Sequence, residues 1–461
     1  MKNEDTICAI STPIGEGGIG IVRISGKDAI LIADKIFFPK INKKLSALPS
    51  HTIHYGEIMD DSKEKIDEAL VSIMKAPNTY TKEDVVEINC HGGALPLKKV
   101  MELVVKNGAR FAEPGEFTKR AFLNGRIDLS QAEAVIDIIN SKTDDSLRLA
   151  VNQLSGILSK KVNAIREELI SIIASVEASI DFVDEDIIEF ISRYEMGKRI
   201  KRAVDEIETL ITTADEGRIY KEGIATAIIG RPNVGKSSLL NALLKEERAI
   251  VTPVPGTTRD VIEEWVNIKG MPLRILDTAG IRHTEDIVEI EGVKRSREAI
   301  KSADLILLLI DGSVKLNEED KSLIEEVGNK RLIVLLNKSD LPPLVKKSDI
   351  EKALPEKEIV SISALTGEGI DRLRSVIHGL LFKGRITAGE RPIITNLRHK
   401  TALEKTKKAL ETLESSLKNE MSEEFLAVDL RGALNALGEI TGETATEDIL
   451  NRIFEEFCVG K

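Results

Sequence analysis

Short apolar runs alternate with amphipathic segments between residues 223 and 380. The runs are Ile224 to Ile229, Leu273 to Leu276, Leu305 to Ile310, Leu332 to Leu336 and Ile359 to Ile362. Uninterrupted apolar runs of this length are typical of strands buried on both faces, and their alternation with helices indicates a mostly parallel sheet wrapped by helices. We therefore expect an α/β domain over residues 220–381.

A helical periodicity flanks this segment on both sides. Apolar residues recur at spacings of three and four at Leu147, Val151, Leu154, Leu158, Ile165, Leu169, Ile172 and Val176. Residues 395–457 have the same character, and an amphipathic helix needs a partner for its apolar stripe. We expect residues 121–219 and 382–461 to pack as one helical bundle into which the α/β domain is inserted.

Residues 1–120 combine strand-like runs with glycine turns. Ile19 to Ile24 and Asp84 to Asn89 predict strands, and Gly15, Gly17 and Gly92-Gly93 punctuate them. The predicted fold class is thus α/β and α multidomain, with an N-terminal α+β domain in front of the bundle.

Composition favours a soluble protein of a reducing compartment. The chain has 461 residues, a net charge of −11 and three scattered cysteines that form no C-x-x-C pair. No signal-peptide pattern opens it and no apolar run is long enough to span a bilayer, so we expect a cytoplasmic location and no membrane partner. The acidic balance disfavours nonspecific nucleic-acid binding. Two basic segments, 106–126 and 391–408, could contact nucleic-acid phosphates, although solvated helix faces are the simpler explanation for each taken alone.

The first candidate site follows the strand at Ile224 to Ile229. Gly230 to Ser237 fits G-x-x-x-x-G-K-[ST], in which backbone N–H groups surround a β-phosphate, the Lys236 ammonium reaches the β- and γ-phosphates, and Ser237 offers a hydroxyl to Mg²⁺. Because the match follows a strand and opens a predicted helix, a chance match is disfavoured. We assign nucleotide contacts here to Asn233, Val234, Gly235, Lys236, Ser237 and Ser238.

Two further segments lie where the γ-phosphate would be. Asp277-Thr278-Ala279-Gly280 follows a predicted strand, so its acid can hold Mg²⁺ through water and Gly280 can donate its N–H to the γ-phosphate. The polar loop before it supplies Thr258 as a second Mg²⁺ hydroxyl. The assigned loop contacts are Thr252, Pro253, Val254, Pro255, Gly256, Thr257 and Thr258.

A third segment predicts selection of guanine. In Asn337-Lys338-Ser339-Asp340 the carboxylate of Asp340 can accept both N1–H and N2–H of guanine, a donor pair that adenine lacks. Lys338 can lie along the base, and Asn337 can join the base loop to the phosphate loop. Ser363 and Ala364 follow the last strand and suit contact with the guanine oxygen. Together these residues predict GTP binding and hydrolysis.

The residue that orients the attacking water is not evident from these motifs. Many GTPases place a Gln directly after D-x-x-G, but here the position holds Ile281, which cannot orient water. The acidic stretch 281–291 offers carboxylates instead.

The chain resembles the tRNA-modification GTPase family MnmE, also called TrmE, among the TrmE-Era-EngA-like GTPases. The resemblance rests on G-R-P-N-V-G-K-S, P-G-T-T-R-D, D-T-A-G-I-R, the segment from Pro114 to Asn124, and the final Phe457 to Lys461. It implies that GTPase domains dimerise across their nucleotide faces with K⁺ in place of an arginine finger. It places K⁺ at Asn233, Thr252, Val254 and Thr257. It also implies that Glu289, nine residues after Gly280, orients the attacking water, with Glu285 or Glu291 as substitutes.

The same resemblance implies a folate site in the N-terminal domain. A tetrahydrofolate derivative, in the 5-formyl or methylene form, would bind at Arg23, Glu87, Arg126 and Lys461, although the family commonly has Lys where this chain has Arg126. As isolated charges, these side chains could equally be surface or ion-pair residues. Cys458 has the spacing of a prenylation box, but its Val-Gly-Lys ending and the family argue against lipidation.

The resemblance implies a homodimeric, K⁺-dependent GTPase that works with the FAD-dependent partner MnmG (GidA) and modifies carbon five of the wobble uridine of tRNA. The added group would be aminomethyl or carboxymethylaminomethyl, with the folate as one-carbon donor. One alternative is a regulatory GTPase switch, for example in ribosome assembly, without a folate pocket. Another is a metallocluster-maturation scaffold, which the scattered cysteines do not support.

Overall fold

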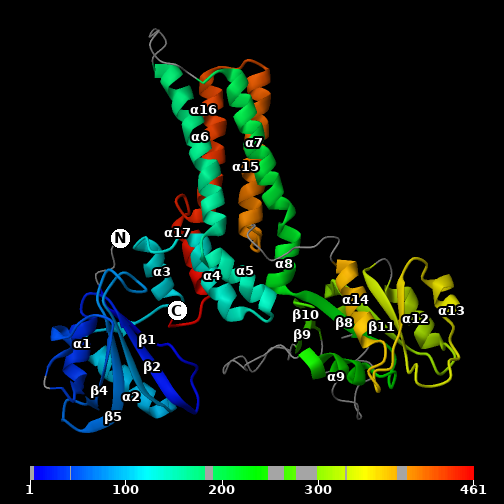
Figure 1. The fold of residues 1–461 in the computed structure, drawn as a ribbon, viewed down its shortest axis with the longest axis horizontal. Helices are drawn as coiled ribbons and strands as arrows, with labels where there is room; N and C mark the ends of the chain where they lie inside the picture. Colours follow the sequence, from blue (N-terminus) through cyan, green and yellow to red (C-terminus); the bar gives the residue numbers. More distant parts are fainter. Residues whose placement is uncertain are drawn as a thin grey trace.

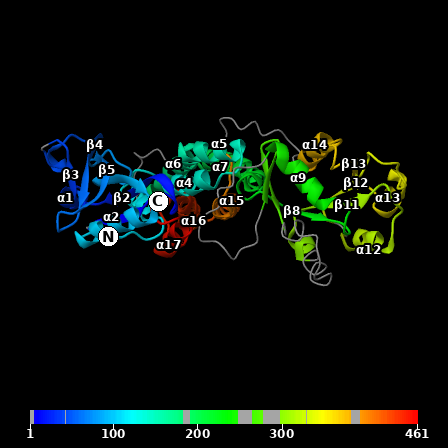
Figure 2. The ribbon, with the colours of Figure 1, turned by 90° about the horizontal axis from the view of Figure 1, so that it is seen from below.

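The computed structural model describes residues 5–41, 43–181, 191–247, 264–276, 298–327, 330–381 and 392–460. Its parts lie along one long axis (Figures 1 and 2): the N-terminal sheet domain at one end, the inserted α/β domain at the other, and the helices between them. The N-terminal α+β, helical and inserted α/β parts confirm the fold class predicted from the sequence. None of the helices in the described ranges has the length and apolar character needed to cross a membrane.

The N-terminal domain is a seven-stranded sheet in the order β3-β4-β5-β6-β2-β1-β7, in which only β1 and β7 pair in parallel. The apolar faces of α1 and α2 cover one side of the sheet and form its core. The elements are β1 Ile7–Ile10, β2 Gly17–Ser25, α1 Ala29–Ile36, β3 Phe37–Pro39, η1 Leu45–Ala47, β4 Thr52–Met59, β5 Lys65–Met74, β6 Val85–Gly92, α2 Ala94–Lys106 and β7 Arg110–Phe111.

The helical domain joins segments from both halves of the chain. The apolar stripes of α6, α7, α15 and α16 form one core, as the periodicity predicts. The elements are α4 Leu129–Asn140, α5 Asp144–Leu154, α6 Ile157–Asp181, α7 Arg193–Thr212, α8 Ala214–Glu222, α15 Leu397–Lys418, α16 Glu423–Thr441 and α17 Glu447–Glu455.

The apolar stripe predicted from Leu147 to Val176 is wrong at its first two residues. Leu147 is 40% exposed and Val151 is 47% exposed, whereas Leu158 and Leu169 are buried. The reason is a break in the helix: α5 ends at Leu154, Gly156 has φ +80°, and α6 begins at Ile157. A residue in the left-handed region ends the helical repeat, so α5 and α6 present different faces to the core.

The inserted domain holds a six-stranded sheet in the order β13-β12-β11-β8-β10-β9, with only β9 antiparallel to its neighbour. Successive residues of β11 enter opposite cores: Leu307 and Leu309 join the core on the side of α9 and α14, whereas Ile306, Leu308 and Ile310 join the core on the side of α12 and α13. The elements are β8 Ile224–Ile229, α9 Lys236–Glu247, β9 Glu264–Ile268, β10 Met271–Ile275, β11 Leu305–Asp311, α12 Glu318–Val327, β12 Leu332–Asn337, α13 Lys347–Ala353, β13 Glu358–Ser361 and α14 Ile370–Leu381.

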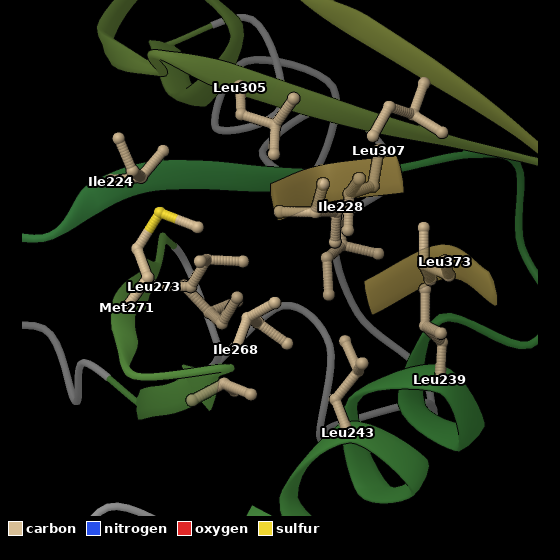
Figure 3. Close-up of a cluster of buried hydrophobic side chains, with 14 of the residues drawn as sticks. Ile224, Ile228, Leu239, Leu243, Ile268, Met271, Leu273, Leu305, Leu307 and Leu373 are labelled. Carbon is tan, nitrogen blue, oxygen red and sulfur yellow. The ribbon is translucent and has the colours of Figure 1, made fainter. Parts of the chain in front are cut away.

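Figure 3 shows the core on the α9 side of this sheet. Leu239 and Leu243 of α9 point toward Ile228 of β8, and Ile268 and Leu273 of the β9–β10 hairpin close the cluster. Strand β9 was not predicted from the sequence. It is the edge strand of the sheet and its burial alternates along the strand, which is a weaker signal than the continuous apolar runs of β8, β11 and β12.

The helix α3 Glu116–Leu123 connects the N-terminal domain to the helices. Ala121 of α3 shares a core with Leu129 and Ala132 of α4 and with Phe454 and Phe457 at the end of the chain. The C-terminal end of the chain therefore lies beside α3, as Figure 1 shows.

Candidate functional site

A tight loop joins the end of β8 to the start of α9. Asn233 and Gly235 have φ values of +61° and +102°. A Cβ at Gly235 would lie 2.3 Å from Nδ2 of Asn337, and one at Gly230 would lie 2.6 Å from the carbonyl oxygen of Leu309. Only glycine avoids both contacts, so these residues leave the loop free to curl its backbone N–H groups around an anion at the N-terminus of α9.

The Lys236 side chain turns back into this loop. Its Nζ donates to the carbonyl oxygens of Gly230 at 2.7 Å and Arg231 at 2.9 Å. Burial lowers the pKa of this ammonium group. Charged phosphate oxygens are stronger acceptors than these two carbonyls. The Lys236 ammonium group therefore lies where a bound polyphosphate could accept its hydrogen bonds. Ser237 and Ser238 occupy the next positions of the first turn of α9.

Asn337 joins the phosphate loop to the loops at the ends of β12 and β13. Its Nδ2 donates to the carbonyl oxygen of Val234 at 2.7 Å, and its Oδ1 accepts from the backbone N–H of Ala364 at 2.9 Å. The side chain is buried. One amide thus joins three loops at the carboxyl ends of β8, β12 and β13, the edge where open α/β sheets bind their ligands.

Asp340 is held by the segment that follows β13. Its Oδ1 accepts from Oγ of Ser363 at 2.6 Å, and that hydroxyl in turn accepts from the backbone N–H of Thr366 at 3.2 Å. Ser339 donates its N–H to the carbonyl oxygen of Ile362 at 3.0 Å. The two segments predicted to contact guanine are therefore bonded to each other.

Several predicted site residues lie outside the described residues. They are Thr252, Pro253, Val254, Pro255, Gly256, Thr257, Thr258, Asp277, Thr278, Ala279, Gly280, Glu285, Glu289, Glu291 and Lys461. The described chain reaches Leu276, whose N–H donates to the carbonyl oxygen of Thr226 in β8 at 2.9 Å. The D-T-A-G motif therefore follows directly in sequence on a strand that neighbours the phosphate-loop strand.

A second group of predicted residues meets on the N-terminal sheet. Arg23 of β2 and Glu87 of β6 are direct cross-strand partners, and Nε and Nη2 of the arginine both lie 2.8 Å from Oε1 of the glutamate. The Arg23 guanidinium also lies 5.7 Å from the ring centroid of Phe117 and 5.9 Å from that of Tyr80. An arginine between a carboxylate and two rings is fixed in position.

Arg126 faces the same tyrosine. Its guanidinium lies 4.7 Å from the Tyr80 ring centroid, and the Tyr80 hydroxyl is 2.9 Å from Oγ1 of Thr118. Tyr80 thus links the two predicted arginines. The sequence analysis missed this residue, because an isolated Tyr between two turn segments carries no periodic or motif signal.

The C-terminal tail is docked beside this cluster. Val459 forms a β-bridge with Pro114, and the carbonyl oxygen of Gly460 accepts from Nη1 of Arg23 and from Oγ of Ser11, both at 3.3 Å. The tail therefore contacts the N-terminal domain through Val459 and Gly460, and the Cys458 side chain is exposed. Its path brings the residue before Lys461 onto Arg23.

Most charges of the two basic segments are engaged within the chain. Arg110 and Arg120 share Asp5 and Glu116 in a partly buried ion cluster. In the second segment the pairs are Arg398 with Glu133, Lys400 with Asp215, Lys405 with Glu439 and Lys407 with Glu208. These pairs favour structural roles for the segments over phosphate binding.

The fold and the first site define a P-loop GTPase: a mostly parallel sheet, a phosphate loop at the N-terminus of α9, and two joined loops that are predicted to contact guanine. Comparison with known proteins agrees. Residues 6–126 match the family described as "GTP-binding protein TrmE N-terminus", and residues 129–458 match "MnmE helical domain". The chain belongs to the MnmE family of tRNA modification GTPases.

Full-length relatives support this assignment. The chain is 51% identical to "tRNA modification GTPase MnmE" of Alkaliphilus oremlandii (strain OhILAs) over 462 residues, covering 100% of both chains. It is 49% identical to the protein of the same name from Bacillus subtilis (strain 168) over 458 residues, covering 99% of this chain and 100% of that one. Among solved structures, Aquifex aeolicus Era with GDP and AlF4⁻ is 33% identical, covers 41% of this chain and 66% of its own, and has a TM-score of 0.28.

Proposed function

We propose that this GTPase is K⁺-dependent and modifies carbon five of the wobble uridine of tRNA together with the FAD-dependent protein MnmG, using a tetrahydrofolate derivative as one-carbon donor. The observation that carries the folate part is the cluster at Arg23, which contacts Glu87 and the carbonyl of Gly460 and shares Tyr80 with Arg126. The family assignment favours tRNA modification over a regulatory switch without such activity.

The nucleotide chemistry is divided among the loops of the inserted domain. Ser237 and Thr258 would hold Mg²⁺, which neutralises charge on the β- and γ-phosphates. Asn233, Thr252, Val254 and Thr257 would hold K⁺, and Glu289 would orient the attacking water. Asn233 lies in the phosphate loop itself, three residues before Lys236, which supports its part in this proposal.

GTP hydrolysis in KCl and in NaCl tests the potassium site. We expect wild-type turnover to be at least about tenfold faster in KCl, because a cation bound beside the phosphates stabilises the charge that develops in the transition state. A tenfold change in rate corresponds to about 1.4 kcal/mol in the barrier. Glu289→Ala should lose this rate in KCl while retaining GDP affinity. Glu291→Ala, at an alternative carboxylate two residues away, should keep most of the activity, and a loss as large as that of Glu289→Ala would assign the water to Glu291 instead. Equal rates in the two salts would remove the K⁺ mechanism.

Light scattering tests the association of two GTPase domains. With GDP and aluminium fluoride, the full chain should adopt a more compact dimer in K⁺ than in Na⁺, because both nucleotide faces would close on each other. A scattering profile that is the same in both salts, under conditions where nucleotide is bound, would contradict closure across the nucleotide faces.

Calorimetry with 5-formyl-tetrahydrofolate tests the N-terminal site. Wild type should bind, and Arg23→Ala should weaken binding at least about tenfold because it removes a fixed cation from the cluster. Lys98→Ala removes an exposed cation of α2 and serves as the control that should bind normally. Absence of binding by folded wild-type protein would favour the regulatory-switch alternative.

A further inference from the structure

The end of β11 packs against the loop that begins at Asn337 and is predicted to select guanine. Asp311 is the last residue of β11 and stands beside Asn337 in the strand register. Its Oδ2 lies 2.6 Å from Nζ of Lys338, and the Asp311 side chain is only 7% exposed. This acid belongs to none of the nucleotide motifs recognised in the sequence.

The neighbouring backbone reinforces the same contact. Gly312 donates its N–H to the carbonyl oxygen of Asn337 at 2.9 Å, and its carbonyl oxygen accepts from Leu344 at 2.8 Å and from Val345 at 3.2 Å. The segment from Asp311 to Gly312 therefore holds the guanine loop at its start and at its end, with the ion pair to Lys338 between them.

Lys338 itself has an unusual backbone conformation. Its φ of +65° lies in the left-handed region, which a lysine adopts only when its surroundings hold it there. Its carbonyl oxygen accepts from Leu341, and its side chain ends on Asp311. The carboxylate is the group that fixes the direction of the lysine stem.

Asp311 is also prepared to remain charged. Oδ1 accepts from the N–H of Ser313 at 2.9 Å and from its hydroxyl at 2.6 Å, which leaves Oδ2 directed at Lys338. Burial alone would raise the pKa of Asp311, but the bonds to Lys338 and Ser313 lower it overall. The acid is therefore ionised at neutral pH and needs the lysine as its partner.

We propose that Asp311 is a positioning residue for guanine-nucleotide binding: it holds Lys338 and thereby preorganises the loop that carries Asp340. A preorganised loop does not have to be ordered when the nucleotide binds, so affinity is gained without a direct contact. This inference concerns nucleotide binding alone and does not depend on the proposed potassium or folate chemistry.

Titration of the full-length protein with a fluorescent GDP analogue tests the proposal. Asp311→Asn keeps the size of the side chain and its acceptor for Ser313 but removes the charge, and it should raise Kd about tenfold. In steady-state hydrolysis KM for GTP should rise while kcat stays within about twofold, because loop preorganisation acts on binding and not on the phosphoryl-transfer step. Asp311→Glu retains the charge and should lie closer to wild type than Asp311→Asn.

A double-mutant cycle shows whether Asp311 acts through Lys338. In a Lys338→Met background, Asp311→Asn should add less than about twofold to Kd, because the partner is already absent. Ser313→Ala, which removes only the hydroxyl bond to Oδ1, and Asp371→Asn, an exposed acid of the same domain paired with Arg374, should leave Kd unchanged.

Three results would overturn the proposal. Full additivity in the cycle would show that Asp311 acts independently of Lys338. An effect of Ser313→Ala as large as that of Asp311→Asn would assign the loss to the turn at Ser313. Tighter binding by Asp311→Asn would show that the ion pair competes with the nucleotide for Lys338. If Asp311→Asn does not fold, Asp311→Ser also removes the charge and takes its place in the titration and in the cycle.

Discussion

Glu133 and Arg398 are separated by 265 positions, yet Nε and Nη2 of the arginine donate to the two carboxylate oxygens of Glu133 at 2.9 and 2.8 Å. Glu133 lies on α4, before the inserted domain, and Arg398 lies at the start of α15, after it. The same carboxylate lies 2.6 Å from Nε2 of His399 and accepts from Asn396 at 3.0 Å. One buried acid thus joins the two halves of the helical domain close to the point where the chain re-enters it.

Replacing this acid should loosen the junction strongly. Glu133→Ala leaves Arg398 and His399 without their shared partner inside the protein, and removal of one member of a buried pair typically costs about 3–5 kcal/mol. Hydrogen exchange of peptides from α4 and α15 should report the loss of local stability. The control is Glu177→Ala, which breaks an exposed pair with Arg431 in the same domain and should cost less than about 1 kcal/mol.

The same group predicts a dependence of stability on pH. Burial alone would raise the pKa of Glu133, but the charges and hydrogen bonds of His399 and Arg398 offset it and lower the pKa to about 2. A depressed folded-state pKa contributes stability that is complete above the unfolded value of 4.5 and is lost as pH falls toward about 2. The difference in urea unfolding between wild type and Glu133→Ala should therefore shrink from pH 6 to pH 3. A difference that grew on acidification would contradict the assignment.

Gly217 permits the two connections of the inserted domain to run side by side. A Cβ on this residue of α8 would lie 2.1 Å from the carbonyl oxygen of Ile394, in the returning connection. Gly217→Ala should lower stability by about 1–3 kcal/mol despite the better helix propensity of alanine. Gly197→Ala in α7 has no atom within 4 Å of its new Cβ and should stabilise by up to about 1 kcal/mol. Thermal unfolding of the two variants should move in opposite directions.

Gly235 and Gly379 allow the same comparison, a crowded glycine against an uncrowded one, for nucleotide binding. Gly235→Ala places Cβ against Nδ2 of Asn337 and requires alanine at φ +102°, so it should disrupt the bond from Asn337 to Val234. We expect at least a tenfold rise in Kd for GDP, or about 1.4 kcal/mol. Gly379→Ala in α14 has open space around its Cβ and should bind GDP like wild type. Unchanged GDP affinity in Gly235→Ala would show that the close approach of the two loops is dispensable.

The fold was predictable where the sequence pattern is strong. The continuous apolar runs of β8, β11 and β12 identified buried parallel strands because both faces of each strand require apolar residues. The edge strand β9 was missed because only one of its faces is buried, and the stripe through Leu147 and Val151 was misassigned because the break at Gly156 shifts the helical phase. A break of one or two residues hardly changes a hydrophobic periodicity that is averaged over many residues, so the sequence pattern does not reveal it.

The sequence by itself was enough to predict the nucleotide site, because Gly230 to Ser237 and Asn337 to Asp340 are contiguous motifs that each carry their functional groups within a few residues. Only the tertiary structure decided which distant residues support them. Asp311 under Lys338, Tyr80 between Arg23 and Arg126, and Glu133 on Arg398 are contacts between separate elements. Each contact depends on how strands and helices pack in space, and the spacing of residues along the sequence does not reveal that packing.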